Sequence, residues 1–203
     1  MGNIKLKVEL YNRYAKIYEK RTKSFANKFI KFDIDLFLKN LPGKKIIDLG
    51  SGPGRDSLIF KQKGFAPLCL DISRGMLNLC KEKGLKTIQM DFNKMDFPKN
   101  SFDGAWTHIA LTTTPKKETW KVIENINWIL KNDGILFLGL IEGKGERWKP
   151  PNEKYDLPRF VSRYQTAEVL KHIKNFKLLY FRKIEKKYTG RNTYLNFMFR
   201  KIN

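Results

Sequence analysis

The stretch IIDLGSGPGRDS, residues 46–57, constrains the fold of this chain more than any other. An apolar run reaches Asp48, glycines then stand at every second position from Gly50, and a helical pattern begins after them. A glycine-rich turn between a strand and a helix lets a ligand approach the backbone closely. The spacing excludes a nucleoside-triphosphate loop, GxxxxGK[ST], since the fifth residue after Gly50 is Arg55 and no lysine follows it. It also departs from the dinucleotide pattern GxGxxG, because the third glycine falls one residue early, at Gly54.

Short apolar runs alternate with helical patterns around this loop. Strand-like runs lie at 45–49, 66–70, 86–90, 103–109 and 134–141, and helical patterns lie at 55–63, 74–83 and 116–131. This alternation predicts an α/β fold in which crossover helices connect a mostly parallel sheet. Two further strand candidates, 176–187 and 193–201, close the chain. With 203 residues, we expect a single domain over 1–203.

Two segments flank the alternating region. Residues 4–40 carry apolar residues at three-to-four spacing, so we expect 1–41 to form an N-terminal helical cap. Residues 142–160 are rich in glycine, proline and charge and show no period. Insertions of that length in compact domains are usually lids or binding loops. We therefore expect residues 142–164 to be an insertion that closes, together with the cap, over a bound ligand.

The charge of the chain is unusual, with 41 Lys and Arg against 20 Asp and Glu and a formal net charge of +21. An anionic partner such as RNA explains it, and so does a lysine-rich composition with a solvated basic surface. The longest apolar stretches, such as 134–141, are too short for a membrane span of about 20 residues. The two cysteines, Cys69 and Cys80, make neither a disulfide framework nor a CxxC metal motif. We therefore expect a reduced, cytoplasmic protein without a metal or a membrane segment.

Several ordered elements carry a resemblance to a known family. DLGSGPGR resembles motif I of the class I S-adenosylmethionine-dependent methyltransferases. LCLDIS, which contains Asp71, and IQMDFNKMDFP, which contains Asp91, are similar to the family's next two motifs. FDGAWTHIAL and WILKNDGILFLGL resemble its fourth and fifth strands, in the same order. RFVSRYQTAEVL, residues 159–170, resembles RFFSYYTPEEL of a subgroup of small methyltransferases.

The resemblance implies a Rossmann-like seven-stranded sheet of order 3-2-1-4-5-7-6, with strand 7 antiparallel and helices on both faces. It implies S-adenosylmethionine as cofactor and S-adenosylhomocysteine as product. Asp71 would bind the ribose hydroxyls, and Asp91 would bind the adenine amino group, with Phe92 beside the ring. Asp48 would offer negative charge to the cofactor's ammonium group. The other cofactor-site residues that the family implies are Gly50, Ser51, Gly52, Gly54, Arg55, Ile72, Met76 and Thr107.

Some of these positions have a second interpretation. Gly54 either faces the cofactor or only starts a helix, and Arg55 is a cofactor contact, a surface charge or an orienter of a neighbouring acid. YNRYAKIYEK resembles the family's cap, in which tyrosines lie across the cofactor. Tyr14 and Tyr18 stand four apart, on one face of a helix. They either direct hydroxyl groups to the cofactor carboxylate or pack as ordinary core residues.

The acceptor side is less defined by sequence. Arg159, Arg163 and Tyr164 are expected to recognise an anionic or aromatic acceptor, or else this segment is surface. Thr112 stands where the resembling subgroup carries a histidine, so we expect it on the substrate side without an inherited catalytic role. His108, at the end of the fourth strand, suits a base near neutral pH. It is alternatively a structural or cofactor-facing residue.

Three functions fit these features. The first is methyl transfer by direct displacement to a small-molecule acceptor through oxygen, nitrogen or sulfur. The second is methylation of RNA, which the charge of +21 suggests. The third is a cofactor-binding subunit without catalysis. The sequence leaves the acceptor and the oligomeric state open.

Overall fold

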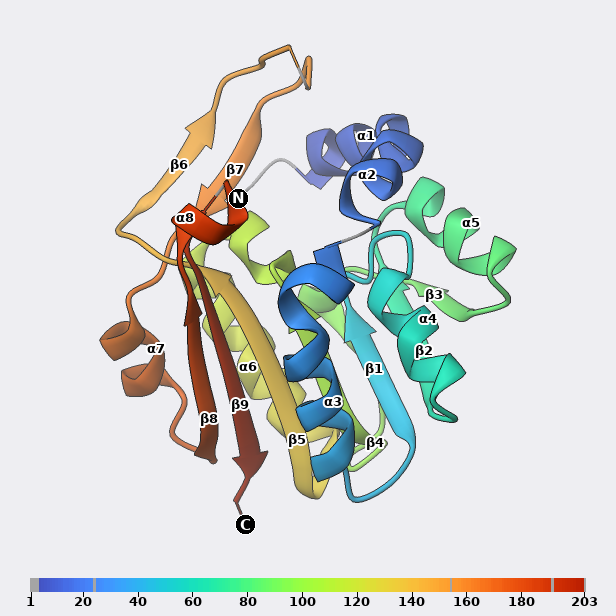
Figure 1. The fold of residues 1–203 in the computed structure, drawn as a ribbon, viewed down its shortest axis with the longest axis vertical. Coiled ribbons are helices and arrows are strands. Elements are labelled where there is room, and N and C mark those ends of the chain that lie inside the picture. The colour runs from blue at the N-terminus through green and yellow to red at the C-terminus, as the bar shows by residue number, and fades with distance from the viewer. Residues whose placement is uncertain (1–3, 24, 154, 191, 203) are drawn as a thin grey trace.

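A seven-stranded sheet forms the core of the protein. The structure, a computed structural model, describes residues 4–23, 25–153, 155–190 and 192–202. The strands lie in the order β3-β2-β1-β4-β5-β9-β8 (Figure 1). Their bounds are β1 Lys45–Leu49, β2 Ala66–Asp71, β3 Lys86–Gln89, β4 Phe102–His108, β5 Leu130–Ile141, β8 Phe176–Ile184 and β9 Tyr194–Lys201.

The strand directions confirm the predicted topology. Strands β1 to β5 pair in parallel, whereas β9 runs antiparallel to both β5 and β8. The strands β8 and β9 thus take the places of the predicted strands 6 and 7. The order reverses beside β1, where β2 lies on one side and β4 on the other, and ligands in open α/β sheets bind at such a switch point.

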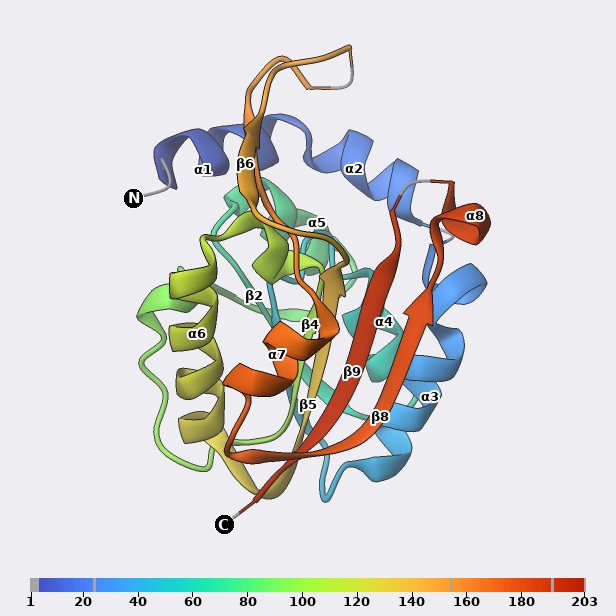
Figure 2. The same cartoon turned by 90° about the vertical axis from the view of Figure 1, so that its left-hand side faces the viewer.

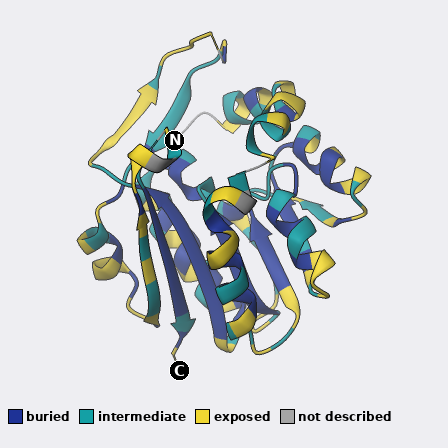
Figure 3. Ribbon diagram, viewed as in Figure 1, coloured by how far each residue is buried: buried dark blue, intermediate teal, exposed yellow. Residues whose placement is uncertain are grey.

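Helices cover both faces of the sheet. Helices α3 (Lys31–Asn40) and α4 (Arg55–Gln62) lie on one face, and α6 (Lys116–Ile129) and α7 (Thr166–His172) lie on the other (Figure 2). Helix α5 (Arg74–Glu82) follows β2. The buried residues of α6 fall at three-to-four spacing, from Thr119 through Val122 and Ile126 to Ile129, so one helical stripe faces the sheet. The central strands are buried along most of their length (Figure 3), as expected for a sheet covered on both faces.

The N-terminal cap consists of several short helices. Helices α1 (Ile4–Arg13) and α2 (Ala15–Thr22) lie beyond the carboxyl end of β1, and a π-helical turn at Ala26–Ile30 leads into α3 (Figure 1). The helix is interrupted between α1 and α2 because the backbone dihedral angles of Tyr14 lie outside the helical region, at φ −99° and ψ 11°. The described residues of 4–40 are thus divided among several helical segments and do not form one continuous helix.

The insertion after β5 is more regular than expected. Strands β6 (Glu146–Lys149) and β7 (Arg159–Ser162) pair antiparallel and form an arm that rises beside the cap (Figures 1 and 2). The pairing is confined to these two short strands, which bury little, so no apolar period marks them in the sequence. A short helix, α8 (Lys186–Thr189), follows β8, which ends three residues earlier than predicted. No helix among the described residues is long and apolar enough to cross a membrane.

Candidate functional site

A cavity lies where the loops after β1, β2 and β4 meet the cap and the arm. Its central chamber encloses about 280 Å³, close to the lower end of the range for small-molecule sites. Two further chambers share wall residues with it. The Asp91 chamber is lined by Asp91, Phe92 and the first turns of α1, and the Asp48 chamber by Asp48, the glycine loop and Arg55. The three chambers thus adjoin one another around shared side chains.

The glycines of the loop serve different purposes. Gly50, Gly52 and Gly54 all have positive φ, between 54° and 76°, which disfavours side chains. A Cβ at Gly50 would lie 2.3 Å from that of Ala110, so this glycine permits close packing with the turn Ala110–Thr113. A Cβ at Gly52 would meet only the Tyr18 ring, at 3.8 Å, so its bare backbone faces the cavity.

Gly54 differs from the expectation that it faces the cofactor. A Cβ at Gly54 would lie 2.6 Å from Leu85 Cδ1 and 2.9 Å from Cys80 Sγ, on the side packed against α5 and the turn before β3. Gly54 does not line any of the three chambers. Its left-handed backbone starts α4, which is the second interpretation given above.

Asp71 ends β2 and holds the glycine loop in place. Its Oδ2 accepts a hydrogen bond from Gly52 N, and its Oδ1 accepts one from Ser73 N, both at 2.9 Å. Burial raises the pKa of Asp71, while the two backbone donors and the ammonium of Lys7 act in the opposite direction. Each oxygen retains a second lone pair, so the carboxylate can still accept hydroxyl groups from the central chamber, which it lines.

Asp91 carries an unused acceptor at the next strand end. Its Oδ1 accepts hydrogen bonds from Asn93 N at 3.0 Å and from Asn93 Nδ2 at 2.9 Å. Its Oδ2 is buried and has no hydrogen-bond partner among the described residues. Because buried polar atoms are nearly always paired, this oxygen marks a place where a ligand donor is missing. The buried Phe92 ring follows directly and lines the same chamber.

Asp48 is less anionic than the sequence suggests. It is almost completely buried, and its Oδ2 accepts a 2.7 Å hydrogen bond from Ser57 Oγ. Burial raises the pKa of Asp48 well above its usual value, and the neighbouring Cys69 and Asp56 raise it further. Asp48 lines its chamber, and its raised pKa favours the protonated form of the carboxyl group.

Arg55 and Asp56 form a buried ion pair beside the cavity. Arg55 Nε and Nη2 reach the two oxygens of Asp56 at 2.6 and 2.8 Å, and Trp106 Nε1 donates to Asp56 at 3.0 Å. Arg55 lines the Asp48 chamber, with its guanidinium 5.4 Å from the Phe25 ring. Arg55 is thus a cavity residue that also neutralises a neighbouring acid.

His108 sits deep in the same region among aromatic rings. Its ring lies 5.6 Å from Phe25 and 6.3 Å from Tyr194, and its Nε2 is buried without a partner among the described residues. Burial, reinforced by the charge of Arg55, lowers the pKa of His108 to about 3. His108 lines the central chamber and is neutral there at physiological pH.

Of the two cap tyrosines expected at the cofactor, Tyr18 lines the cavity and Tyr14 does not. Tyr18 lines both the central and the Asp48 chambers, and burial raises the pKa of its phenol, so it remains a donor. Tyr14 lies outside the cavity. Its ring packs 5.1 Å from that of Tyr155 on the arm, and its hydroxyl accepts a hydrogen bond from Asp156 N at 3.2 Å. Tyr14 thus contacts the arm, whereas Tyr18 contacts the cavity.

Two further cap residues, which the sequence did not single out, line the cavity. Lys7 and Tyr11 line both the Asp91 and the central chambers. The Lys7 ammonium lies 4.9 Å above the Phe92 ring and donates to Thr114 Oγ1 at 3.3 Å. Tyr11 contacts Tyr18 edge to face, at 6.3 Å between ring centres. Lys7 and Tyr11 are four residues apart on α1, and this spacing in the sequence could have indicated that they share a helical face.

Most of the remaining cofactor-site candidates reach the cavity. Ser51 lines the Asp48 chamber, Met76 lines the central chamber, and Ile72 lines the central and Asp91 chambers. Thr107 does not line any of the three, although it is fully buried. Successive side chains of a strand point to opposite faces, so Thr107 and the cavity-lining His108 face apart.

The acceptor-side candidates divide in the same way. Thr112 and Arg159 line the central chamber. Arg163 lies elsewhere, donating from Nη1 to the Glu142 carbonyl at 3.0 Å and from Nη2 to Asn192 Oδ1 at 3.2 Å. It fixes the base of the arm to the turn before β9.

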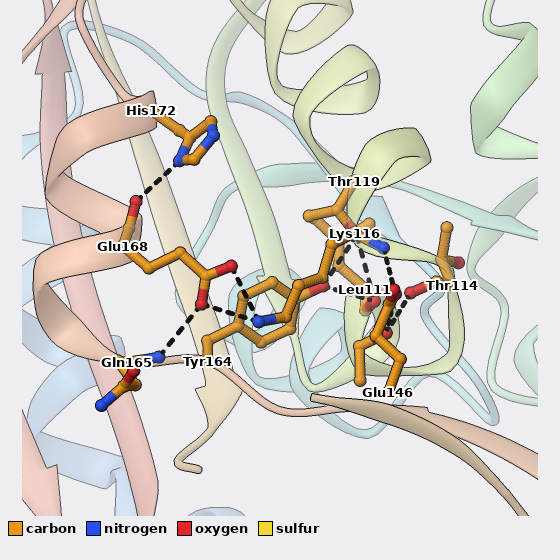
Figure 4. A network of polar contacts seen from close by, with 10 residues as sticks. Leu111, Thr114, Lys116, Thr119, Glu146, Tyr164, Gln165, Glu168 and His172 are labelled. Atoms are coloured by element: carbon orange, nitrogen blue, oxygen red, sulfur yellow. Dashed lines mark hydrogen bonds and ion pairs between the residues drawn. The ribbon is translucent and has the colours of Figure 1, made fainter. Parts of the chain in front are cut away.

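Tyr164 belongs to the core. It is fully buried, and its hydroxyl lies 2.9 Å from Thr119 Oγ1 of α6 (Figure 4). Lys116 covers its ring and pairs with Glu168, and Gln165 is the N-cap residue of α7 (Figure 4). Tyr164 does not line any of the three chambers. Across the described ranges, no three His, Cys, Asp or Glu side chains are grouped to hold a metal ion.

Comparisons with known proteins agree with this geometry. Residues 47–138 match the family model described as a methyltransferase domain. An uncharacterised protein of Methanocaldococcus jannaschii, MJ1123, is 27% identical over 181 residues, which cover 84% of this chain and 83% of the relative.

Solved structures share the whole fold. The DhpI–SAH complex superposes with a TM-score of 0.79 at 15% identity, covering 99% of this chain and 98% of the other. The Burkholderia thailandensis 1,6-didemethyltoxoflavin-N1-methyltransferase, with 1,6-didemethyltoxoflavin and S-adenosylhomocysteine bound, superposes with a TM-score of 0.73 at 18% identity. That match covers 96% of this chain and 88% of the other.

Proposed function

By its fold and by its methyltransferase domain the chain belongs to the class I S-adenosylmethionine-dependent methyltransferases, and from this we propose that it methylates a small-molecule acceptor. S-adenosylmethionine is its cofactor. The observation that carries the proposal is that adjoining chambers share wall residues, among them Ile72 and Phe92. One chamber is lined by Asp91, and the next by Asp71, Gly52 and side chains of the arm.

The residues of the cavity fit this cofactor. The free Oδ2 of Asp91 suits the adenine amino group, which is a donor, and Phe92 lies beside it. Asp71 suits the ribose hydroxyls, because its oxygens are fixed by Gly52 N and Ser73 N. The open space above Gly52 leaves room for the cofactor between the Asp91 and Asp48 chambers. The methionine half then lies in the Asp48 chamber.

The chain's own part in the reaction is to position the acceptor and exclude water. When bound, the cofactor supplies a methyl group on a sulfonium, which an acceptor atom displaces directly. The cap and the arm cover the cavity through the Tyr14–Tyr155 contact and the hydrogen bond from Arg21 Nη1 to Tyr155 Oη, at 3.1 Å. A covered, dry cavity strengthens electrostatic interactions inside it.

His108 does not suit the expected role of a base. An efficient base has a pKa near the working pH, whereas that of His108 is lowered to about 3. It is a weak proton acceptor at neutral pH, and we assign it to shaping the cavity with Phe25 and Tyr194.

RNA remains a second candidate acceptor because of the charge of +21. The cover that the cap and arm form over the cavity favours a small acceptor, since a polymer needs an open path for its backbone. We also propose a cytoplasmic location, which the two free thiols of Cys69 and Cys80 support.

An acceptor screen that follows S-adenosylhomocysteine release tests the proposal. Small hydroxyl, amine and thiol compounds form one arm of the screen, and bulk tRNA and rRNA form the other. The Gly52→Val variant provides the background, because a side chain there is strained at φ 54° and enters the cavity. Release above this background with a small compound supports the proposal. Release with RNA alone shifts the function to RNA, and the absence of release in both arms favours a non-catalytic subunit.

A further inference from the structure

Three cations from three different segments face the central chamber on the arm side. Arg21 comes from α2, Lys149 from β6 and Arg159 from β7, and all three line the chamber that also contains Asp71 and Gly52. Asp71 is the only carboxylate among the described residues of that lining. We call these three residues the cation clamp.

The cation clamp has no acidic partner among the described residues, unlike several other cations of this protein. Lys116 pairs with Glu168 and Lys183 with Glu142, whereas among the described residues no carboxylate forms an ion pair with any member of the clamp. The Nε of Arg159 is buried and has no hydrogen-bond partner within the described ranges. A buried donor without a partner points to a missing acceptor.

The geometry of the arm forces these like charges together. Lys149 and Arg159 stand directly opposite in the β6–β7 ladder, a placement that destabilises a hairpin. Burial lowers the pKa of Lys149, and the charges of Arg163, Arg159 and Arg147 lower it further. An anion between the members of the clamp would relieve this repulsion.

Tyr155 holds the two guanidinium groups of the clamp in place. The Arg159 guanidinium lies 4.2 Å from the centre of the Tyr155 ring and that of Arg21 lies 5.4 Å from it. Arg21 Nη1 also donates to the Tyr155 hydroxyl at 3.1 Å. The ring is almost completely buried, so the arginines are ordered before any ligand arrives. Preorganised donors lose less entropy on binding.

We propose that the cation clamp binds the anionic group of the methyl acceptor, a carboxylate or phosphate on a small molecule. This inference rests on the proposed function and adds the substrate class. Arginine forks match both anions with paired N–H donors, and the lysine adds a point charge. The clamp is not needed for the carboxylate of the cofactor, since the methionine half is proposed to lie in the Asp48 chamber. That chamber is lined by Arg55 and Tyr18 and by no member of the clamp.

Calorimetry on the protein saturated with S-adenosylhomocysteine tests the clamp. The probes are benzoate and phenyl phosphate, with neutral benzamide as the matched uncharged compound. We expect both anions to bind and benzamide to bind at least about tenfold more weakly. Preference for phenyl phosphate or for benzoate then identifies the anionic group. Equal affinity for benzamide, or no binding of either anion, overturns the proposal.

Variants locate the effect. Lys149→Met and Arg159→Met should each weaken anion binding about tenfold or more, and Arg159→Lys, which keeps the charge but not the fork, should fall between. Lys144→Met is the control, because Lys144 is exposed near the base of the arm and does not line the chamber. An equal loss in Lys144→Met would mean diffuse attraction and overturn the clamp.

Cofactor affinity separates the two proposals. S-adenosylhomocysteine should bind Lys149→Met as tightly as the unaltered protein. A parallel loss of S-adenosylhomocysteine and anion affinity would mean that the clamp serves the cofactor, which overturns the inference. If anions bind through the clamp but the acceptor screen yields no release, the clamp stands as a binding site and the proposed catalysis fails.

Discussion

The Asp91→Asn substitution should change the base preference of the cofactor site from adenine to hypoxanthine, the base of S-inosylhomocysteine. In the structure, Oδ1 of Asp91 accepts from both Asn93 N and Asn93 Nδ2, and Oδ2 is buried without a partner among the described residues. An asparagine would keep its oxygen towards Asn93 and present its NH₂ to the chamber. The adenine amino group would then meet a donor and lose one hydrogen bond to a charged group. Such a loss is worth about 2 kcal/mol, or roughly thirtyfold in affinity.

The assay is calorimetry with two ligands. S-adenosylhomocysteine should bind Asp91→Asn roughly thirtyfold more weakly than it binds the unaltered protein. S-inosylhomocysteine, in which a carbonyl oxygen replaces the amino group, should lose no affinity, because the new NH₂ can donate to it. Asp96→Asn removes the same charge from an exposed position nearby and should change neither affinity. Unchanged S-adenosylhomocysteine binding by Asp91→Asn, or equal losses for both ligands, would refute the adenine contact.

Four further outcomes are expected. Asp71→Ala should weaken S-adenosylmethionine binding by about 1–3 kcal/mol by calorimetry, and unchanged affinity would remove the ribose role. The pKa of His108 is lowered to about 3 from an ordinary value near 6.5, so the neutral ring stabilises the fold fully above pH 6.5 and that contribution is lost as the pH falls towards 3. Its NMR signals should not titrate near pH 6.5, and a titration there would contradict the burial. Tyr164→Phe removes the hydroxyl contact with Thr119 and should cost about 1 kcal/mol in urea unfolding without changing cofactor affinity, whereas a changed affinity would place Tyr164 at the site. Amides in β6 and β7 should gain protection from hydrogen exchange when S-adenosylhomocysteine binds, and equal protection in both states would make the arm a fixed wall.

The cofactor half of the site could be predicted because it depends on topology. In a parallel sheet the carboxyl ends of neighbouring strands meet at one edge, so Asp48, Asp71 and Asp91 had to converge once the strand order was known. Strand alternation also separates Thr107 from His108, a signal that was present in the sequence but outweighed by the family resemblance.

The cap and the arm could not be predicted to the same level. Tyr14 and Tyr18 are joined by a backbone hydrogen bond from Tyr18 N to Tyr14 O, yet the Tyr14 ring contacts the arm and Tyr18 lines the cavity. The position of the arm, which decides this difference, depends on contacts distant in the sequence. Arg163 and Tyr164 follow a hairpin without an apolar period, so their directions depend on the register between β6 and β7. Register in so short a pair is fixed by tertiary contacts, such as the 2.6 Å hydrogen bond from Ser162 Oγ to the Thr114 carbonyl.

The β6–β7 arm pairs with itself and contributes no strand to the seven-stranded sheet. Its sequence can therefore diverge, lengthen or shorten without disturbing the ladder that aligns Asp48, Asp71 and the glycine loop. The residues assigned here to the acceptor are concentrated in this arm, and those assigned to the cofactor lie almost entirely in the sheet and its loops. Replacement of the contiguous β6–β7 segment alone could therefore change the acceptor, while the residues that bind the cofactor stay unchanged.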